Sequence, residues 1–170
     1  MKKEEIIFLR ESNFIEREYG IVALEDAKKA WEYAKRNKDY PSLEYVLGIH
    51  QRLMQRLNPK IAGKVREIGV RVGERICPYK PREELERNIA DWIESYFLKE
   101  ETIEGIIRSH VVFEMLHPFA DGNGRTGRIL MNAQMLKYGH PIKIIYEKNK
   151  WDYYDWFHPN ITEFETVLIK

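Results

Sequence analysis

The sequence predicts an all-α fold, a single compact bundle of helices that carries one small β-hairpin. Apolar residues recur at intervals of three and four along most of the chain, which is typical of helices that bury one face. Residues 58–81 are the exception, because glycine and proline interrupt them and Ile68, Val70 and Val72 alternate along the chain. With 170 residues, of which 44% are hydrophobic, the chain can build one buried core and is short for two.

The first predicted helix covers residues 3–19. Phe8, Ile15 and Tyr19 fall on one apolar stripe, and Gly20 is a suitable residue to end the helix. The stripe predicts that this helix packs on the rest of the bundle.

Two polar residues, Ser12 and Glu16, lie one turn apart beside that stripe. The simplest role of Glu16 is an ion pair with a neighbouring arginine such as Arg10 or Arg17, and surface pairs of this kind contribute little to stability. By themselves these residues assign no function to the pair.

The next two helices are predicted over residues 21–37 and 43–57, and Ser42 can cap the second of them. His50 lies on the apolar face of the 43–57 helix and has no acidic residue one turn away. We therefore expect His50 to be a hydrogen-bonded core residue rather than a catalytic one.

The 58–81 stretch has two interpretations that the residues leave open, a short hairpin or a long surface loop. It contains Cys77, the single cysteine of the chain, which cannot form an internal disulfide. We expect Cys77 to be a small buried hydrophobic residue rather than a nucleophile.

Helical spacing returns over residues 83–98 and again from residue 103, where Thr102 can serve as the N-terminal cap. His110 lies on a wholly apolar face of the second of these helices. It is expected to be packed and hydrogen-bonded in the core.

The densest group of reactive side chains is residues 117–128, HPFADGNGRTGR, which lead directly into helical spacing from Ile129. A helix N-terminus presents unpaired N–H groups, and glycines let a phosphate approach them closely. Arg125 and Arg128 place two cations in the first turn, where they oppose the helix dipole unless an anion compensates. These features predict a polyphosphate site, with Asp121 as a Mg²⁺ ligand and His117 as proton acceptor.

Other interpretations of this stretch fit less well. Its GxGxxG spacing is formally a dinucleotide fingerprint, but that motif must follow a β-strand. A P-loop needs Lys and Ser/Thr where Arg128 and Ile129 stand, and an EF-hand needs glycine where Thr126 stands. An ordinary turn between two helices would need neither the histidine nor the paired arginines.

After the motif helix, Gly139 is the expected residue of its C-terminal cap. Residues 142–146 could form a brief extended segment, and the aromatic residues of 151–157 have helical spacing and predict a hydrophobic floor.

The motif resembles the signature of the Fic family, HxFx(D/E)GNGRxxR, at every specified position. The resemblance extends from about residue 43 to residue 157 and includes the segment 63–66, the approach His110-x-x-Phe113 and the Gly-His-Pro that begins at residue 139. It implies a Fic-type helical bundle in which the hairpin is a flap. A target protein would dock along this flap, near residues 64–73, as an added strand.

The resemblance also implies transfer of AMP from ATP to a Ser, Thr or Tyr hydroxyl of a target protein. His117 would be the general base and Asp121 would hold Mg²⁺ between the α- and β-phosphates. Nucleotide binding would fall to Gly122, Asn123, Gly124, Arg125 and Arg128, of which the two arginines would take the β- and γ-phosphates respectively. Family members that transfer the γ-phosphate carry Lys at the position of Gly124.

A further resemblance concerns the first helix. Self-inhibiting Fic proteins carry (S/T)xxxE(G/N), and Ser12 to Glu16 is similar to it, although Arg17 replaces the usual Gly or Asn. By this resemblance Glu16 would pair with Arg128, so that Arg128 could not bind the γ-phosphate. The expected organisation is an inhibitory helix over residues 1–20 and a catalytic domain over 21–170. In the family a tyrosine lies near the nucleotide base, and the resemblance makes Tyr154 a candidate for that position in this chain.

Composition limits the partners. Lys and Arg number 28 against 27 Asp and Glu, so no overall field draws the chain to nucleic acid or to a membrane. The chain has no apolar run long enough to span a membrane, and a cytoplasmic protein is expected. Transfer of another phosphate-linked group, removal of AMP, or silent binding remain alternatives, and a homo-oligomer is left open.

Overall fold

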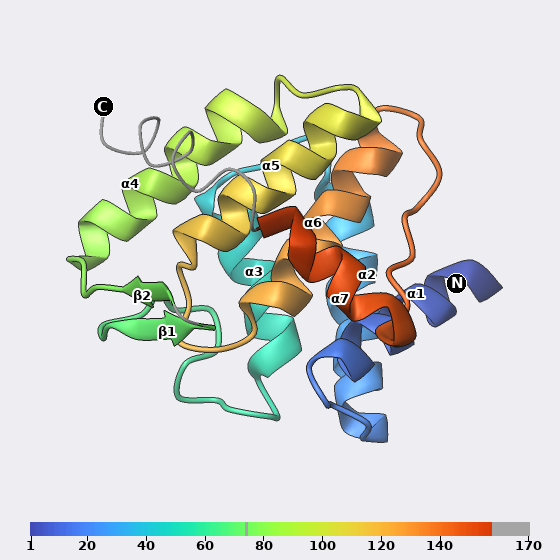
Figure 1. Cartoon of the computed structure of the whole chain (residues 1–170), viewed down its shortest axis with the longest axis horizontal. Coiled ribbons are helices and arrows are strands. Elements are labelled where there is room, and N and C mark those ends of the chain that lie inside the picture. The colour runs from blue at the N-terminus through green and yellow to red at the C-terminus, as the bar shows by residue number, and fades with distance from the viewer. Residues whose placement is uncertain (74, 158–170) are drawn as a thin grey trace.

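The computed structural model describes residues 1–73 and 75–157. Within these ranges the chain is mainly helical with one antiparallel hairpin, which confirms the predicted fold class (Figure 1). The elements are α1 (Lys3–Ile15), α2 (Ile21–Asn37), α3 (Leu43–Met54), β1 (Val70–Val72), β2 (Arg75–Cys77), α4 (Arg82–Trp92), α5 (Ile103–Leu116), α6 (Asn123–Lys137) and α7 (Lys150–Tyr154).

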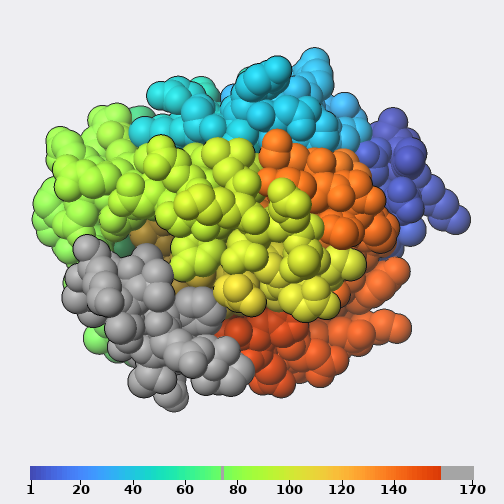
Figure 2. All heavy atoms as spheres, turned by 90° about the horizontal axis from the view of Figure 1, so that it is seen from above, coloured from blue at the N-terminus to red at the C-terminus, as the bar shows by residue number. Residues whose placement is uncertain are grey.

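The motif helix α6 lies at the centre of the bundle. It packs against α5, α3, α2 and α1, and most of its residues are buried (Figure 1). The main core includes Phe8 and Leu9 of α1, Trp31 of α2 and Phe113 of α5. Figure 2 shows the same bundle from another side, with the first residues of the chain at the opposite end from the hairpin and α4.

Helix α1 ends at Ile15, so the prediction of a helix to residue 19 was wrong. The N–H of Arg17 donates to the carbonyl of Phe14 and the N–H of Glu18 to that of Asn13, at 2.9 and 3.0 Å. This is a Schellman cap, and it requires a left-handed residue at position 17, where φ is 60°. Glu16 is thereby fixed at the last corner of the helix.

Two other helix boundaries differ from the sequence prediction. Helix α3 ends at Met54 rather than residue 57, and α4 ends at Trp92. A π-helical turn, Ile93–Phe97, replaces the last part of the predicted 83–98 helix. The cause is a bond from the N–H of Leu98 to the carbonyl of Ile93, five residues back, at 3.0 Å.

Both predicted N-terminal caps are present. The hydroxyl of Ser42 accepts a hydrogen bond from the N–H of Tyr45 at 3.2 Å. The hydroxyl of Thr102 accepts one from the N–H of Gly105 at 3.1 Å. These local bonds explain why the starts of α3 and α5 could be placed from the sequence.

The 58–81 stretch contains a hairpin rather than only a loop. Val70 pairs with Cys77 and Val72 with Arg75, in antiparallel register. Gly73, with φ of 58°, supplies the left-handed residue of the turn. Cys77 is 3% exposed, as a small core residue should be.

Beyond α6, Gly139 completes the expected C-terminal cap, because His140 N–H donates to the carbonyl of Met135 at 2.8 Å. Within the described part of the chain, residues 142–146 belong to no strand. The side chain of Asn132 instead bonds both backbone groups of Lys143. Searched over the described residues, the helices include none that is both long and apolar enough to cross a membrane.

Candidate active site

His117 ends α5 in the left-handed conformation, with φ of 45° and ψ of 60°. This conformation is strained for a residue with a Cβ, and it turns the chain sharply into the motif loop. His117 Nδ1 lies 3.2 Å from the carbonyl of Glu114. Because a carbonyl can only accept, Nδ1 carries the hydrogen and Nε2 is the nitrogen left to act as a base.

The motif loop is anchored in the core by Phe119, which is fully buried. Its ring stacks on His50 at a centroid distance of 3.8 Å, with the two planes parallel within 1°. Asn123 also bonds both backbone groups of Phe119 at 2.9 Å. The loop is therefore held by its own first helical residue as well as by α3.

His50 is the core residue that its apolar setting predicted. Its Nδ1 accepts the N–H of Gly63 at 3.0 Å, and so its Nε2 carries the hydrogen and donates to the carbonyl of Asp121 at 3.0 Å. Burial lowers the pKa of His50 to about 4, which keeps the ring neutral. Both ring nitrogens are satisfied, and neither is available for proton transfer.

The N-terminus of α6 carries the glycines and the arginines of the predicted anion site. Gly122 caps the helix with φ of 77°. The N–H groups of the first turn, from Asn123 onward, have no carbonyl to bond within the helix. Asp121 accepts the N–H of Gly122 at 2.6 Å, and its side chain is 64% exposed. A single exposed carboxylate beside an anion site suits Mg²⁺, which is bound by one or two carboxylates together with phosphate oxygens.

The two motif arginines are both buried but differ in their partners. Arg125 Nη2 lies 3.4 Å from the sulfur of Met54 and 3.8 Å from Asp121. Among the described residues, the only carboxylate paired with its charge is therefore that of Asp121, at the long distance of 3.8 Å. A buried guanidinium with so little compensation is suited to bind an anion.

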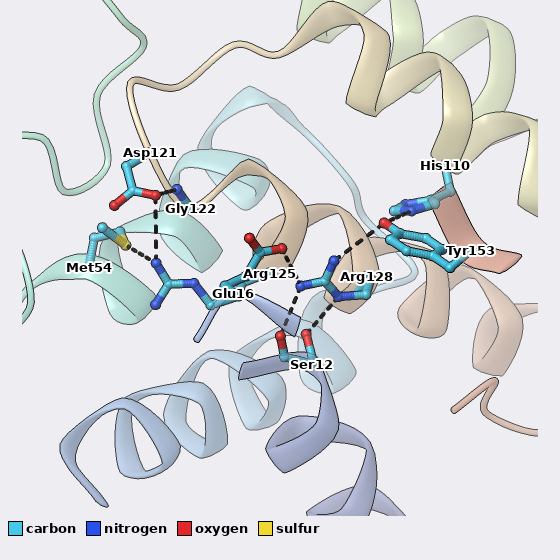
Figure 3. Close-up of polar contacts among 9 residues, drawn as sticks. All are labelled: Ser12, Glu16, Met54, His110, Asp121, Gly122, Arg125, Arg128 and Tyr153. Atoms are coloured by element: carbon cyan, nitrogen blue, oxygen red, sulfur yellow. Dashed lines mark hydrogen bonds and ion pairs between the residues drawn. The ribbon is translucent and has the colours of Figure 1, made fainter. Parts of the chain in front are cut away.

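Arg128 instead has three polar neighbours (Figure 3). Its Nε donates to the hydroxyl of Ser12 at 2.9 Å, and its Nη2 donates to the Ser12 carbonyl at 2.9 Å and to Glu16 at 2.8 Å. Its Nη1 lies 3.3 Å from the hydroxyl of Tyr153. The contact with Glu16 uses one carboxylate oxygen.

The Glu16 carboxylate also covers the helix N-terminus. A Cβ added at Gly124 would collide with Glu16 Oε1, so the carboxylate lies against the backbone at the start of α6. Glu16 is 36% exposed at its side chain, while Arg128 is 2% exposed. The acid lies at the rim of the candidate anion site, and the guanidinium is buried behind it.

Burial lowers the pKa of His117 to about 4, and the nearby charges of Arg66 and Arg75 act in the same direction. The bond to the Glu114 carbonyl and the charge of Glu16 oppose that change. The imidazole is therefore neutral at physiological pH, which is the form that can accept a proton.

A second titratable cluster lies behind Arg128. Burial raises the pKa of the Glu114 carboxyl to about 8; Arg128 opposes this rise and Glu16 adds to it. His110 is 2% exposed, and its Nε2 lies 2.9 Å from the hydroxyl of Tyr153. Burial and the charge of Arg128 lower the pKa of His110 to about 3, so it is a neutral core residue as predicted.

Of the motif residues that the sequence selected, the structure places Arg128 in contact with Ser12 and Glu16, and Arg125 within 3.8 Å of Asp121. Sequence reasoning missed Tyr153, because it named the neighbouring Tyr154. Tyr153 is 3% exposed and bonds Arg128 and His110. Several aromatic residues follow one another on α7, and the sequence does not indicate that Tyr153 is the buried one.

Glu114 and Arg66 were also missed. Glu114 is an acidic residue in the apolar run before the motif, a signal that could have been read from the sequence. Arg66 belongs to the segment that carried part of the family resemblance, but no role was assigned to it.

Comparison with known proteins agrees with this geometry. Residues 40–135 match the Fic/DOC family. Protein adenylyltransferase fic-1 of Caenorhabditis elegans is 34% identical over 123 residues, which is 71% of this chain and 24% of the relative. Protein adenylyltransferase Fic of Aedes aegypti is 32% identical over 146 residues, which is 84% of this chain and 29% of the relative. The chain thus spans about a quarter of the length of these relatives.

Solved structures share the fold. A Fic domain containing signaling protein from Bacteroides thetaiotaomicron has a TM-score of 0.79 at 20% identity and covers 95% of this chain and 73% of that one. Fic-1 from C. elegans has a TM-score of 0.72 at 24% identity, covering 93% and 56%. The matched family region, the identity to the curated relatives and the assembled motif lead to one conclusion: the chain belongs to the Fic/DOC family.

Proposed function

We propose that the chain is a protein adenylyltransferase domain, which transfers AMP from ATP to a Ser, Thr or Tyr hydroxyl of a target protein. The observation that carries the proposal is the 3.2 Å contact of His117 Nδ1 with the carbonyl of Glu114, which leaves Nε2 to accept a proton beside the candidate anion site of α6. The curated relatives named protein adenylyltransferase support the same activity.

In the proposed reaction, the hydroxyl oxygen of the target attacks the α-phosphorus of ATP while His117 Nε2 takes up the hydroxyl proton. The bond from the α-phosphorus to the oxygen that bridges to the β-phosphate breaks, and pyrophosphate leaves with that electron pair. Asn123 and Gly124 supply N–H groups for the charge on the phosphate oxygens, while Gly122 donates its own N–H to Asp121 and shapes the turn before them. Arg125 takes the β-phosphate and Arg128 the γ-phosphate, and Mg²⁺ held by Asp121 would neutralise charge between the phosphates.

The target is proposed to dock along the hairpin, near residues 64–73, as an added strand. The exposed apolar side chains of Val72 and Ile76, 38% and 66% exposed, support this placement because they offer contact area beside the strand edge. A cytoplasmic location and the absence of nucleic-acid and membrane partners stay predictions.

We further propose that residues 1–20 inhibit the catalytic domain formed by residues 21–170, whose last residues, 158–170, lie outside the described ranges. The Arg128 guanidinium donates four hydrogen bonds, and Ser12 and Glu16 accept three of them. ATP bound in this state cannot bring its γ-phosphate onto Arg128, and a displacement of the phosphates is enough to slow transfer by orders of magnitude.

The test is incubation of the parent and of Glu16→Gly with ATP and Mg²⁺, followed by intact-mass measurement. Glu16→Gly should gain the mass of an adenylyl group on itself or on an added protein, much faster than the parent. The double variant Glu16→Gly with Arg128→Ala should lose the gain. Glu4→Gly is the matched control, since it makes the same change at an exposed site of α1.

The mass added also distinguishes the alternatives. A different phosphate-linked group would give a different increment, and removal of AMP would require a modified substrate to lose mass. A folded Glu16→Gly protein that binds ATP and modifies nothing would support a silent binding module instead. Equal rates in Glu16→Gly and the parent would count against inhibition but not against transfer.

A further inference from the structure

Arg66 is a buried arginine whose hydrogen-bond partners among the described residues are main-chain carbonyls. Arg66 is 3% exposed. Nε donates to the carbonyl of His117 at 2.9 Å, and Nη1 donates to those of Ile68 and Pro78, both at 2.7 Å. One guanidinium therefore joins three segments of the chain.

This arrangement is costly if it serves only stability. A buried cation without a carboxylate loses its hydration, and carbonyl dipoles return only part of that free energy. Ion pairs of the described residues involve other arginines and lysines, but not Arg66. A charge placed in this way points to a function that needs the fork geometry of arginine.

We propose that Arg66 is a positioning residue for AMP transfer, which couples the target-docking hairpin to the backbone of the catalytic His117. The inference rests on the proposed function, because it assigns a role in that reaction to a residue that touches neither ATP nor the phosphate-binding motif.

The first part of the coupling is the backbone of His117. Its left-handed conformation is strained and must be held by its surroundings. Arg66 holds two consecutive carbonyls of the loop, that of His117 through Nε and that of Pro118 through its own N–H at 2.9 Å. Loss of these bonds would free the turn that aims the imidazole.

The second part is the hairpin. Ile68 precedes β1 and Pro78 follows β2, so Nη1 closes the base of the hairpin by binding one carbonyl on each arm. A target strand added to the hairpin would be positioned relative to the same guanidinium that positions His117. The distance between the docked backbone and the base is thereby set by one rigid group.

The third part is electrostatic. The charged groups that act on His117 are Arg66 and Arg75, which lower its pKa, and Glu16, which raises it. Arg66 is the only one of these that also bonds the His117 backbone within the described residues. It therefore contributes both to the orientation of the imidazole and to its neutral form.

The experiment compares Arg66→Lys and Arg66→Gln, each in the Glu16→Gly background, by transfer rate, ATP affinity and the NMR titration of the His117 imidazole. A lysine keeps the charge but cannot span three carbonyls, so Arg66→Lys should lose about 10- to 100-fold in rate with the ATP affinity and the His117 pKa unchanged. Arg66→Gln should lose the rate and also raise the His117 pKa. Arg87→Lys, the same change at an exposed residue of α4, should behave as the parent.

Two results would overturn the inference: a parental transfer rate in Arg66→Lys, or an Arg66→Lys protein that unfolds or loses ATP affinity in step with rate, which indicates general support of the fold. If the Glu16→Gly background itself transfers nothing, the proposed function fails. The titration then decides alone, and an unchanged His117 pKa in Arg66→Gln would reject the coupling.

Discussion

At the residue scale, His117 combines a strained backbone with an imidazole that has to remain neutral. His117→Ala should abolish transfer while leaving ATP affinity nearly unchanged, because the base acts on the hydroxyl and not on the phosphates. Isothermal titration and intact-mass measurement on the same protein check both halves. His140→Ala, at the end of α6, is the matched control and should keep full activity.

The pKa of His117 makes a second prediction at this scale. A base must be unprotonated, and burial lowers the pKa of His117 to about 4. The transfer rate of Glu16→Gly should therefore show no histidine inflection near the ordinary value of about 6.5 and should decline only as the pH approaches about 4. A rate profile with its midpoint near the ordinary value would show that the imidazole is solvated during turnover.

Arg17 is the residue at which this chain departs from the inhibitory pattern, and the structure gives the reason for that pattern. Position 17 has φ of 60°, which glycine adopts freely and arginine does not. Arg17→Gly should raise the free energy of unfolding by about 0.5–1 kcal/mol, measured by urea denaturation. Arg10→Gly, in the interior of α1, should lower it by a similar amount.

At the element scale, α1 contributes to the core as well as to the proposed inhibition. Phe8 and Leu9 are 2% and 1% exposed, and Glu5 accepts hydrogen bonds from Trp31 and Lys35 of α2. Deletion of residues 1–20 should therefore destabilise the domain, since each lost apolar side chain costs about 1.5–3 kcal/mol of burial.

A thermal melt and binding of a hydrophobic dye would detect this loss. Because α1 is buried, Glu16→Gly is a cleaner test of the proposed inhibition than the deletion. A truncated protein with the melting temperature of the parent would show that α1 is only a lid.

At the scale of the whole molecule, three histidines with lowered pKa values link stability to pH. The pKa values of His50, His110 and His117 are lowered to about 4, 3 and 4, against about 6.5 in an unfolded chain. The unfolded chain therefore binds protons first, and this contribution to stability is complete above pH 6.5 and is lost as the pH falls toward 4. Glu114 acts in the opposite direction, because its raised pKa favours the folded state most below 4.5 and that gain is lost as the pH rises through about 8.

The three histidines together change the free energy of unfolding more than Glu114 alone does. The melting temperature should therefore fall as the pH is lowered from about 6.5 to about 4. His50→Gln removes one of the three groups and should make this pH dependence shallower, whatever its effect at neutral pH. A melting temperature that rises over the same range would mean that Glu114 and other acids dominate.

The sequence by itself determined the helical fold class, the caps of several helices and the residues that make up the motif. The caps Ser42, Thr102 and Gly139 and the hydrophobic spacing are local features, because they depend on residues within one or two turns. The residues of the candidate anion site are equally local, since glycines, acid and arginines follow one another into a single helix.

Tertiary structure decided which distant groups meet at that motif. Glu16 and Arg128 are 112 residues apart in the chain, and their contact depends on the packing of α1 against α6 and on the cap that ends α1 at Ile15. The same holds for Tyr153 and for Arg66, whose partners lie on other elements. Periodicity shows which face of a helix is buried but not what lies against it, because that depends on how all the helices pack together.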